Sequence, residues 1–194
     1  MATEIELKAW VDDPDTTRTQ INSLAQSEGA YEKFDTYWRW KDDNPQNPPL
    51  GSGVRVRKEI RRGNTMGIIT FKNKEVRDGI EINDEREFEV SNTVVFEELL
   101  KRLGLVPWIE KHKTGQSWRA GRITVELSLV EKLGWFVELE ILSDQRDSES
   151  VDKARTELLT LLDRLGIGRD RLEERYYIEM LKTRLISSNA ETSR

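Results

Sequence analysis

The chain has 194 residues, enough for one domain, and its charged residues make up 35% against about 25% in an average protein. That excess charge belongs either on an ionic exterior or in an ionic cavity. The formal net charge is −5, so the chain lacks the basic footprint of a protein that binds duplex nucleic acid.

Residue counts and motif searches narrow the chemistry further. The chain has no cysteine and one histidine, His112, which excludes disulfides, thiol catalysis and multi-histidine metal sites. No GxxxxGK[ST] loop, no apolar run long enough to span a membrane and no secretory leader occur in it. We therefore expect a cytoplasmic protein, without a membrane partner, that works with carboxylates, lysines, arginines and oxygen-binding metals.

The first quarter of the chain predicts two strands around a helix. Residues 4–11 alternate between charged and apolar side chains, as a strand does. Residues 14–28 predict a helix that Gly29 ends. Residues 31–41 are aromatic and strand-like, and the proline-rich residues 42–53 predict a loop.

The middle of the chain predicts a hairpin, a further strand and a helix. Residues 54–60 and 66–74 alternate on either side of a turn, and residues 80–90 alternate again. Residues 93–103 predict a helix that is capped by Asn92 or Thr93 before it and by Gly104 after it.

The last third predicts three strands and two helices. Residues 105–113 and 117–129 read as strands joined by a turn at Thr114-Gly115, and residues 135–142 as another strand. The two helices are expected over residues 149–165 and 171–185. The sequence thus predicts an α+β protein with one domain over residues 1–186 and a flexible tail over 187–194.

Charged side chains gather by sign on one face of each predicted strand. The acidic pairs are Glu4 and Glu6 (followed by Lys8), Glu87 and Glu89, and Glu138 and Glu140; the basic pairs are Arg55 and Arg57, Lys72 and Lys74, and Lys111 and Lys113. A solvated antiparallel sheet also alternates in this way, but it usually mixes signs, because like charges side by side repel. The segregation favours a closed barrel with helices packed outside and an ionic interior.

Such an interior requires a ligand that carries both signs. Carboxylates bind hard cations such as Mg²⁺, whereas arginine and lysine bind phosphate oxygens. A metal-chelated triphosphate has both kinds of group.

Several motifs in this order resemble the CYTH family, also called triphosphate tunnel metalloenzymes, which includes class IV adenylate cyclases and thiamine triphosphatases. The motifs are EIELK at 4–8, VRVR at 54–57, TFK at 70–72, EFE at 87–89, IEKHK at 109–113, ITVE at 123–126 and LGWFVELE at 133–140. The resemblance implies a closed, eight-stranded antiparallel tunnel.

The resemblance also implies residue roles, with Mg²⁺ or Mn²⁺ as cofactor. The metal ligands would be Glu4, Glu6, Glu87, Glu89, Glu126, Glu138 and Glu140. The phosphate-binding residues would be Lys8, Arg55, Arg57, Lys72, Lys74, Lys111, Lys113 and Arg119, and the catalytic residues Lys8 and Glu126. The family usually has Asp before the LG turn, where this chain offers either Glu126 or Ser128.

Other conspicuous residues are expected to be structural. We expect His112 on the opposite face from Lys111 and Lys113, and Arg61-Arg62 at a solvated hairpin tip. Tyr37, Trp38 and Trp40 are expected to pack in the sheet rather than to bind a base, and Tyr176 and Tyr177 are expected to anchor the last helix.

Three functions remain open at this point. The leading hypothesis is a divalent-metal-dependent enzyme, monomer or homodimer, that hydrolyses a small-molecule triphosphate. The alternatives are a class IV adenylate cyclase that releases pyrophosphate and a binding module that does not catalyse.

Overall fold

The computed structural model describes residues 3–41, 53–77, 80–144 and 147–192, with the backbone alone for 72–77, 82–85 and 187–192. The strands are β1 (Thr3–Trp10), β2 (Gln26–Trp40), β3 (Val54–Arg61), β4 (Asn64–Arg77), β5 (Ile80–Val90), β6 (Leu105–Ala120), β7 (Ile123–Val130) and β8 (Gly134–Ser143). The helices are α1 (Pro14–Leu24), α2 (Thr93–Arg102), α3 (Ser148–Arg164) and α4 (Tyr177–Thr192), with a 3₁₀ turn at Arg169–Arg171. The α+β class is confirmed, with a large antiparallel sheet and four α-helices over the described residues.

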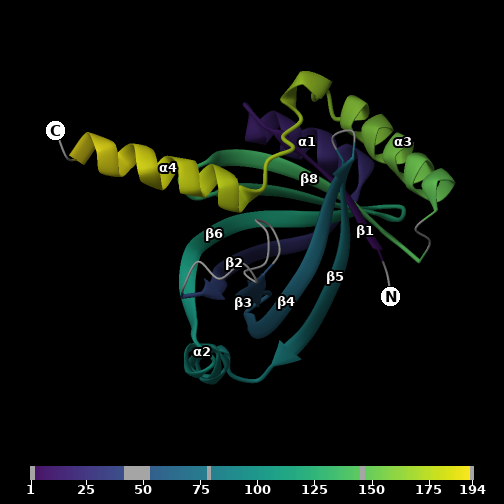
Figure 1. Cartoon of the computed structure of the whole chain (residues 1–194). Helices are drawn as coiled ribbons and strands as arrows, with labels where there is room; N and C mark the ends of the chain where they lie inside the picture. The colour runs from purple at the N-terminus through teal and green to yellow at the C-terminus, as the bar shows by residue number, and fades with distance from the viewer. Residues whose placement is uncertain (1–2, 42–52, 78–79, 145–146, 193–194) are drawn as a thin grey trace.

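The strands follow one another in the order β1-β5-β4-β3-β2-β6-β7-β8 (Figure 1). Strand β1 also pairs with β8 along its whole length, and with β5 through residues Thr3–Glu6. This order places β3, β2 and β6 side by side, and β8 next to β1. The strands that carry basic pairs and those that carry acidic pairs therefore occupy different parts of the sheet.

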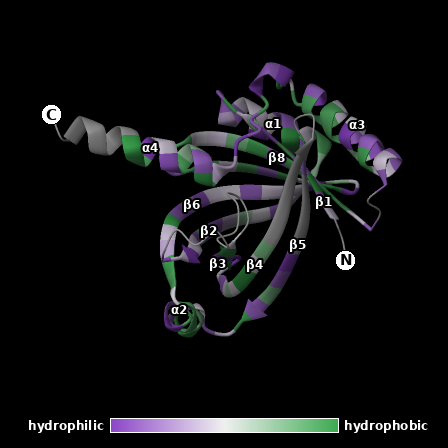
Figure 2. Cartoon of the chain, viewed as in Figure 1, coloured by the Kyte–Doolittle hydropathy of each residue, from purple (hydrophilic) through white to green (hydrophobic). Residues whose placement is uncertain are grey.

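Helices cover the apolar outer face of the sheet. Helix α3 packs on β1 and β8, α1 on β7, and α2 on β3 and β6 (Figure 1). The largest core cluster lies under α1 and α3 and includes Leu7, Leu139 and Leu158, all at most 1% exposed. Figure 2 shows hydrophobic and hydrophilic stretches alternating along α3, as expected for a helix with one buried face.

Side-chain caps fix where three helices begin. Asp13 accepts hydrogen bonds from the backbone N–H groups of residues 15 and 16 at the start of α1. Asn92 caps α2 and Asp147 caps α3 in the same way. The cap predicted at Asn92 is confirmed, because its carboxamide oxygen accepts from the N–H of Val95 at 3.2 Å.

The predicted turn at Thr114-Gly115 is wrong, because β6 continues through both residues to Ala120. Gly115 is needed there for close approach rather than for a turn. A Cβ atom at this position would lie 2.5 Å from the carbonyl oxygen of Leu127 and 2.9 Å from the Tyr31 hydroxyl. The chain turns instead at Gly121, which has a φ of +61°.

Other boundaries also differ from the prediction. Helix α1 ends at Leu24, and Gly29, expected to end it, lies in β2 at a shift of register with a φ of +103°. A glycine at a bulge gives the same sequence signal as a glycine after a helix. Helix α4 spans Tyr177–Thr192, whereas the sequence predicted this helix over residues 171–185; the flexible tail over residues 187–194 stays a prediction. The loop predicted over residues 42–53 lies outside the described residues except for Gly53.

None of the described helices has both the length and the apolar character needed to cross a bilayer.

Candidate active site

A cavity of about 410 Å³ lies on the inner face of the sheet. Among the described residues, five cationic side chains border it: Lys33, Arg55, Arg57, Lys111 and Lys113. Seven carboxylates border it as well: Glu4, Glu6, Glu81, Glu87, Glu126, Glu138 and Glu140. Tyr177, the first residue of α4, and Tyr176 just before it also border the cavity.

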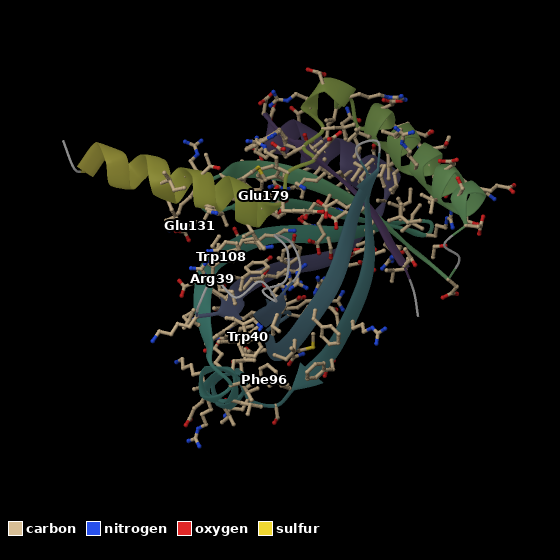
Figure 3. The ribbon with its side chains drawn as sticks, viewed as in Figure 1. Arg39, Trp40, Phe96, Trp108, Glu131 and Glu179 are labelled. Carbon is tan, nitrogen blue, oxygen red and sulfur yellow. The ribbon has the colours of Figure 1, made fainter. Side chains whose placement is uncertain are left out.

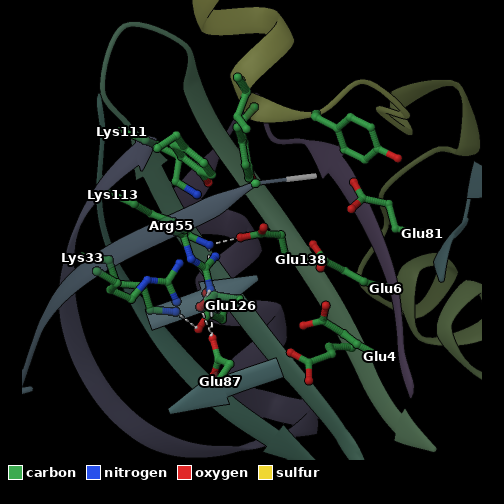
Figure 4. A pocket seen from close by; sticks show the side chains of 18 of the residues that line it. Glu4, Glu6, Lys33, Arg55, Glu81, Glu87, Lys111, Lys113, Glu126 and Glu138 are labelled. Atoms are coloured by element: carbon green, nitrogen blue, oxygen red, sulfur yellow. Dashed lines mark hydrogen bonds and ion pairs between the residues drawn. The ribbon is translucent and has the colours of Figure 1, made fainter. Parts of the chain in front are cut away.

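Four of the seven carboxylates lie across the cavity from the cations, whereas Glu87 and Glu126 pair directly with cations. We call the cations of β2, β3 and β6 the basic wall, and Glu4, Glu6, Glu138 and Glu140 of β1 and β8 the acidic wall. Figure 4 shows Lys33, Lys111 and Lys113 facing Glu4 and Glu6 across the cavity. Within the acidic wall, Glu6 of β1 lies directly opposite Glu140 of β8, because the two strands are paired in this register.

Asp35 of β2 lies behind the basic wall and binds two of its members. Its carboxylate accepts from Nε and Nη2 of Arg57 at 2.7 and 3.0 Å, and Nζ of Lys111 lies 3.0 Å from it. Burial raises the pKa of Asp35, but the charges of Arg57 and Lys111 outweigh burial and hold the pKa well below its usual range. Asp35 is therefore a fixed anion.

Glu126 of β7 joins the two walls. Its carboxylate lies 2.6 Å from Nζ of Lys33 and 2.9 Å from Nζ of Lys113, and it accepts from the Tyr31 hydroxyl at 2.8 Å. Lys113 also contacts Glu138 of the acidic wall. Burial raises the pKa of Glu126, but Lys113 and Lys33 outweigh it and hold that pKa well below its usual range.

The same network acts on the two lysines in opposite directions. Burial lowers the pKa of Lys113, but Glu126 and Glu138 together raise it well above the ordinary value. Burial also lowers the pKa of Lys33, and the charge of Glu126 does not fully compensate, because Arg57 and Lys113 repel a proton there. Lys113 is thus firmly cationic, whereas Lys33 releases its proton more easily than a solvated lysine.

A smaller network lies at the β3–β4–β5 side of the cavity. Nη2 of Arg55 donates to Oγ1 of Thr70 at 2.8 Å and to Glu87 at 2.9 Å, and the Thr70 hydroxyl donates to Glu87 at 2.6 Å. Glu87 reaches the cavity, whereas Glu89 is exposed and does not border it.

Lys8 is buried beside the cavity rather than in its lining. Its Nζ lies 2.9 Å from Glu81, and both side chains are almost fully buried. Burial lowers the pKa of Lys8, but the negative charges of Glu81 and Glu6 raise it by more, so the pKa of Lys8 lies above its ordinary value. The ammonium also lies 5.2 Å from the ring centroid of Tyr177.

Tyr177 begins α4 at the edge of this network. The ring centroid lies 4.9 Å from Nζ of Lys111 and 5.9 Å from Nζ of Lys113. Its hydroxyl has no hydrogen-bond partner among the described residues, although the residue is only 8% exposed. Burial and the nearby Glu138 raise the pKa of Tyr177 well above its ordinary value, so the hydroxyl stays protonated.

The structure brings most of the predicted site residues to one cavity. Those that border it are Glu4, Glu6, Arg55, Arg57, Glu87, Lys111, Lys113, Glu126, Glu138 and Glu140. Lys8 and Glu89 do not, and Arg119 lies exposed and paired with Glu28. The side chains of Lys72 and Lys74 lie outside the described part of the chain. The roles of all these residues stay predictions.

Glu126 and Ser128, the two candidates for the position where the family usually has Asp, lie differently relative to the cavity. Glu126 borders the cavity, whereas Ser128 is fully buried outside its lining, and its hydroxyl has no partner within the described residues. The carboxylate that this strand offers to the cavity is therefore Glu126.

Sequence reasoning missed Lys33, Asp35 and Glu81. Lys33 and Asp35 share the inner face of β2 with Tyr31 and Tyr37, two residues apart at each step. That alternation was present in the sequence, but the aromatic residues between them suggested packing. Glu81 lies near the start of an acidic stretch of the sequence. Its alternation with Asn83 and Glu85 did not distinguish it there as a residue of the site.

Among the residues expected to be structural, His112 does lie outside the cavity. It stacks on Phe34 with ring centroids 4.5 Å apart and contacts Glu32 and Glu131. Trp38 packs in the core under α2 and also borders the cavity. Tyr37, Tyr176 and Tyr177 border the cavity as well.

The expected solvated tip at residues 61–62 is correct only in part. Arg61 ends β3, and its guanidinium donates to Glu59 at 3.0 Å and to Ser117 at 2.7 Å. Arg62 is exposed in the turn with a φ of +52°.

On the outer side of the cavity, Trp108 lies below the start of α4 (Figure 3). The guanidinium of Arg39 lies 5.3 Å from its ring centroid. This cation–π pair joins β2 to β6 beside the cavity, which Trp108 borders.

The donor set of the acidic wall suits a hard divalent cation. The side chains of this wall offer carboxylate oxygens, the preferred ligands of Mg²⁺ and Mn²⁺. Within the described residues, no three acidic or histidine side chains form a ready-made metal-binding group. Mg²⁺ commonly takes one or two carboxylates and completes its shell with water and substrate phosphates, which fits walls of this kind.

Comparison with known proteins identifies the family. The family model described as the CYTH domain matches residues 2–177. The chain belongs to the CYTH family. The resemblance drawn from its motifs is thereby confirmed.

This CYTH protein is similar in sequence to an archaeal protein and in fold to proteins of archaea and of a plant. A Methanocaldococcus jannaschii protein that carries the provisional name adenylate cyclase is 26% identical over 181 residues, or 91% of this chain and 97% of that protein. A Pyrococcus horikoshii protein of solved structure has a TM-score of 0.81 and 23% identity, covering 93% and 98% of the two chains. A Hippeastrum protein, named an adenylyl cyclase with a dominant triphosphatase activity, has a TM-score of 0.64 and 14% identity, covering 94% and 96%. At these identities the two structural likenesses support the fold alone.

Proposed function

We propose that this CYTH protein is a divalent-metal-dependent enzyme that hydrolyses a triphosphate. The observation that supports it is the cavity with a basic wall facing an acidic wall. Among the described lining residues, seven carboxylates stand against five cations, an excess of two negative charges. A polyanion would be repelled unless divalent cations enter with it, so the charge balance favours a metal–triphosphate complex as ligand.

We further propose that the sheet works as a closed tunnel, as predicted from the sequence. The pairing of β1 with β5 on one side and β8 on the other supports this arrangement. Because the β1–β5 ladder includes only Thr3–Glu6, this seam is the place where the tunnel would open most easily.

Each wall has a distinct role in this proposal. Arg55, Arg57 and Lys111 would bind phosphoryl oxygens, assisted by Lys113, and by Lys72 and Lys74 as predicted from the sequence. Glu4, Glu6, Glu138 and Glu140 would hold Mg²⁺ or Mn²⁺. The bound ion would supply charge neutralisation at the phosphates, the main requirement of phosphoryl transfer.

Glu126 has a different role from the one first expected. Because it is already bound to Lys33, Lys113 and Tyr31, it would orient the two lysines rather than ligate the metal. Lys8, buried against Glu81, keeps its predicted catalytic role only if the substrate reaches past Glu81.

A class IV adenylate cyclase is the second candidate. The name of the Methanocaldococcus jannaschii relative favours it, whereas the Hippeastrum protein is named for a dominant triphosphatase activity. In hydrolysis, water attacks the γ-phosphorus and the bond to the β-phosphate oxygen breaks. In cyclisation, the ribose 3′-hydroxyl attacks the α-phosphorus and pyrophosphate leaves.

Product analysis separates these reactions. The purified protein is incubated with ATP or inorganic tripolyphosphate and Mg²⁺ or Mn²⁺, and the products are separated by chromatography. Hydrolysis predicts free phosphate from both substrates and no cyclic AMP. Cyclic AMP with pyrophosphate would contradict it, and tight binding without turnover would indicate a binding module.

Replacing Glu4 and Glu6 together by Gln tests the acidic wall. We expect turnover to fall by at least roughly 100-fold, since loss of even a neighbour of a metal ligand costs 10–100-fold. The matched control is Glu98→Gln with Glu149→Gln, two exposed carboxylates on α2 and α3. Activity near that of the wild type in the first variant, with the fold checked by circular dichroism, would refute the metal role.

The cytoplasmic location, and the monomeric or homodimeric state, stay predictions.

A further inference from the structure

We propose that Asp35 is a positioning residue for the reaction, acting through Arg57 and Lys111; this rests on the proposed function. Asp35 does not border the cavity, and its side chain is fully buried. No substrate can reach it directly. Its two cationic partners both border the cavity, so Asp35 lies one contact away from the phosphates.

The register of the sheet makes this arrangement specific. Asp35 is the Cα partner of Arg57 on β3 and of Lys111 on β6, so its carboxylate lies between the two cations. The contact with Arg57 is bidentate and uses Nε and Nη2. A guanidinium held at two points cannot rotate freely, and Nη1 is left for a phosphoryl oxygen.

A carboxylate at this place also solves a charge problem. Arg57 and Lys111 flank the same point from adjacent strands, and two buried cations repel each other unless an anion separates them. With Asp35 present, they stay close enough to contact one phosphate chain. Without it, we expect them to move apart, although the total positive charge of the basic wall would rise.

The ion pair of Glu59 and Arg61, on the same strand as Arg57, provides a matched control. Glu59 of β3 lies two residues after Arg57 on the same face and is 6% exposed, and it binds Arg61 at 3.0 Å. Arg61 does not border the cavity. Glu59→Gln therefore removes a comparable buried carboxylate that pairs with neither Arg57 nor Lys111, although its charge also acts on Lys33, its neighbour in the β2–β3 ladder.

The first test measures tripolyphosphate hydrolysis with Mg²⁺ in the two variants. For Asp35→Asn we expect kcat to fall on the order of 10–100-fold, the usual loss when a group that orients a ligand is removed. KM should not rise, because the remaining charge still attracts the anion. Glu59→Gln should keep kcat within about threefold. The folded fraction is measured by circular dichroism at the assay temperature.

The second test is a double-mutant cycle with Arg57→Gln, which also covers a failure of Asp35→Asn to fold. The double variant replaces both charges of the Asp35–Arg57 pair by amides, so neither charge of that pair is left alone, although Lys111 still loses its contact with Asp35. If Asp35 acts through Arg57, adding Asp35→Asn to Arg57→Gln costs at least about threefold less activity than adding it to the wild type. Where the single variant does not fold, the double variant should retain at least about one third of the activity of Arg57→Gln.

The outcomes separate the two proposals. A wild-type protein that turns over no triphosphate refutes the proposed function, and the role of Asp35 with it. An active wild type with an equally active Asp35→Asn, or with independent effects in the cycle, overturns the positioning role alone.

Discussion

At the scale of single residues, buried charges in this protein are held by charges on neighbouring strands. Lys8 and Glu81 show the principle most simply, since they form one pair between β1 and β5 with both side chains almost fully buried. Such a pair adds little to stability compared with apolar packing, but breaking it leaves an uncompensated buried charge.

Glu81→Gln is therefore expected to destabilise the fold by about 3–5 kcal/mol, because the Lys8 ammonium loses its anion. The control is Asp15→Asn, which removes the exposed Arg18–Asp15 pair and should cost no more than about 1 kcal/mol. Urea unfolding of both variants measures the difference. Equal effects of the two substitutions would show that the burial of Lys8 carries no penalty.

The acid side of the pH–stability curve follows from Glu126 and Asp35. Their pKa values are well below normal in the folded state, because neighbouring cations outweigh burial. Their stabilisation is therefore complete above the unfolded values, about 4, and is lost as the pH falls through the folded values.

We expect the Tm to be steady between about pH 7 and pH 5 and to fall below that range. In Glu126→Gln the Tm should start lower and fall less steeply, so that the two proteins differ less at low pH than at pH 7. Thermal melts across the range measure both slopes. A constant difference in Tm between the two proteins would contradict the assignment of this slope to Glu126.

At the scale of elements, alternation predicted most of the strands and which face of each is charged. It could not fix boundaries at glycines, because the same residue serves a turn, a bulge or a close approach. Gly115 was predicted to turn the chain, yet it lies within β6 where Leu127 and Tyr31 leave no room for a Cβ. The role of Asp35 could not be read from the sequence either. Its partners Arg57 and Lys111 lie on two other strands, and only the register of the sheet places them beside it.

Gly115→Ala is expected to destabilise the protein by about 1–3 kcal/mol, because the added methyl group overlaps the backbone of β7 and the Tyr31 hydroxyl. Since that hydroxyl donates to Glu126, activity should fall too. Thr114→Ala, on the adjacent residue of the same strand, serves as control and should change the free energy of unfolding by less than the glycine substitution. A well-tolerated Gly115→Ala would contradict the close packing of β6 on β7.

At the scale of the whole molecule, the order of the strands separates charges that would otherwise neutralise one another. Strands β3, β2 and β6 lie together and form the basic wall, whereas β8 and β1 form the acidic wall. Glu126 and Lys113 join the walls through contacts that leave the other members facing the cavity. The molecule thus offers a site whose ligand has to be an anion and a cation together.

Calorimetric titration with inorganic tripolyphosphate, in Mg²⁺ and separately in EDTA, tests this pairing of opposite charges most directly. The account predicts binding that is tighter in Mg²⁺ by at least about tenfold, or about 1.4 kcal/mol. Equal affinity in EDTA, or no binding under either condition, would contradict it.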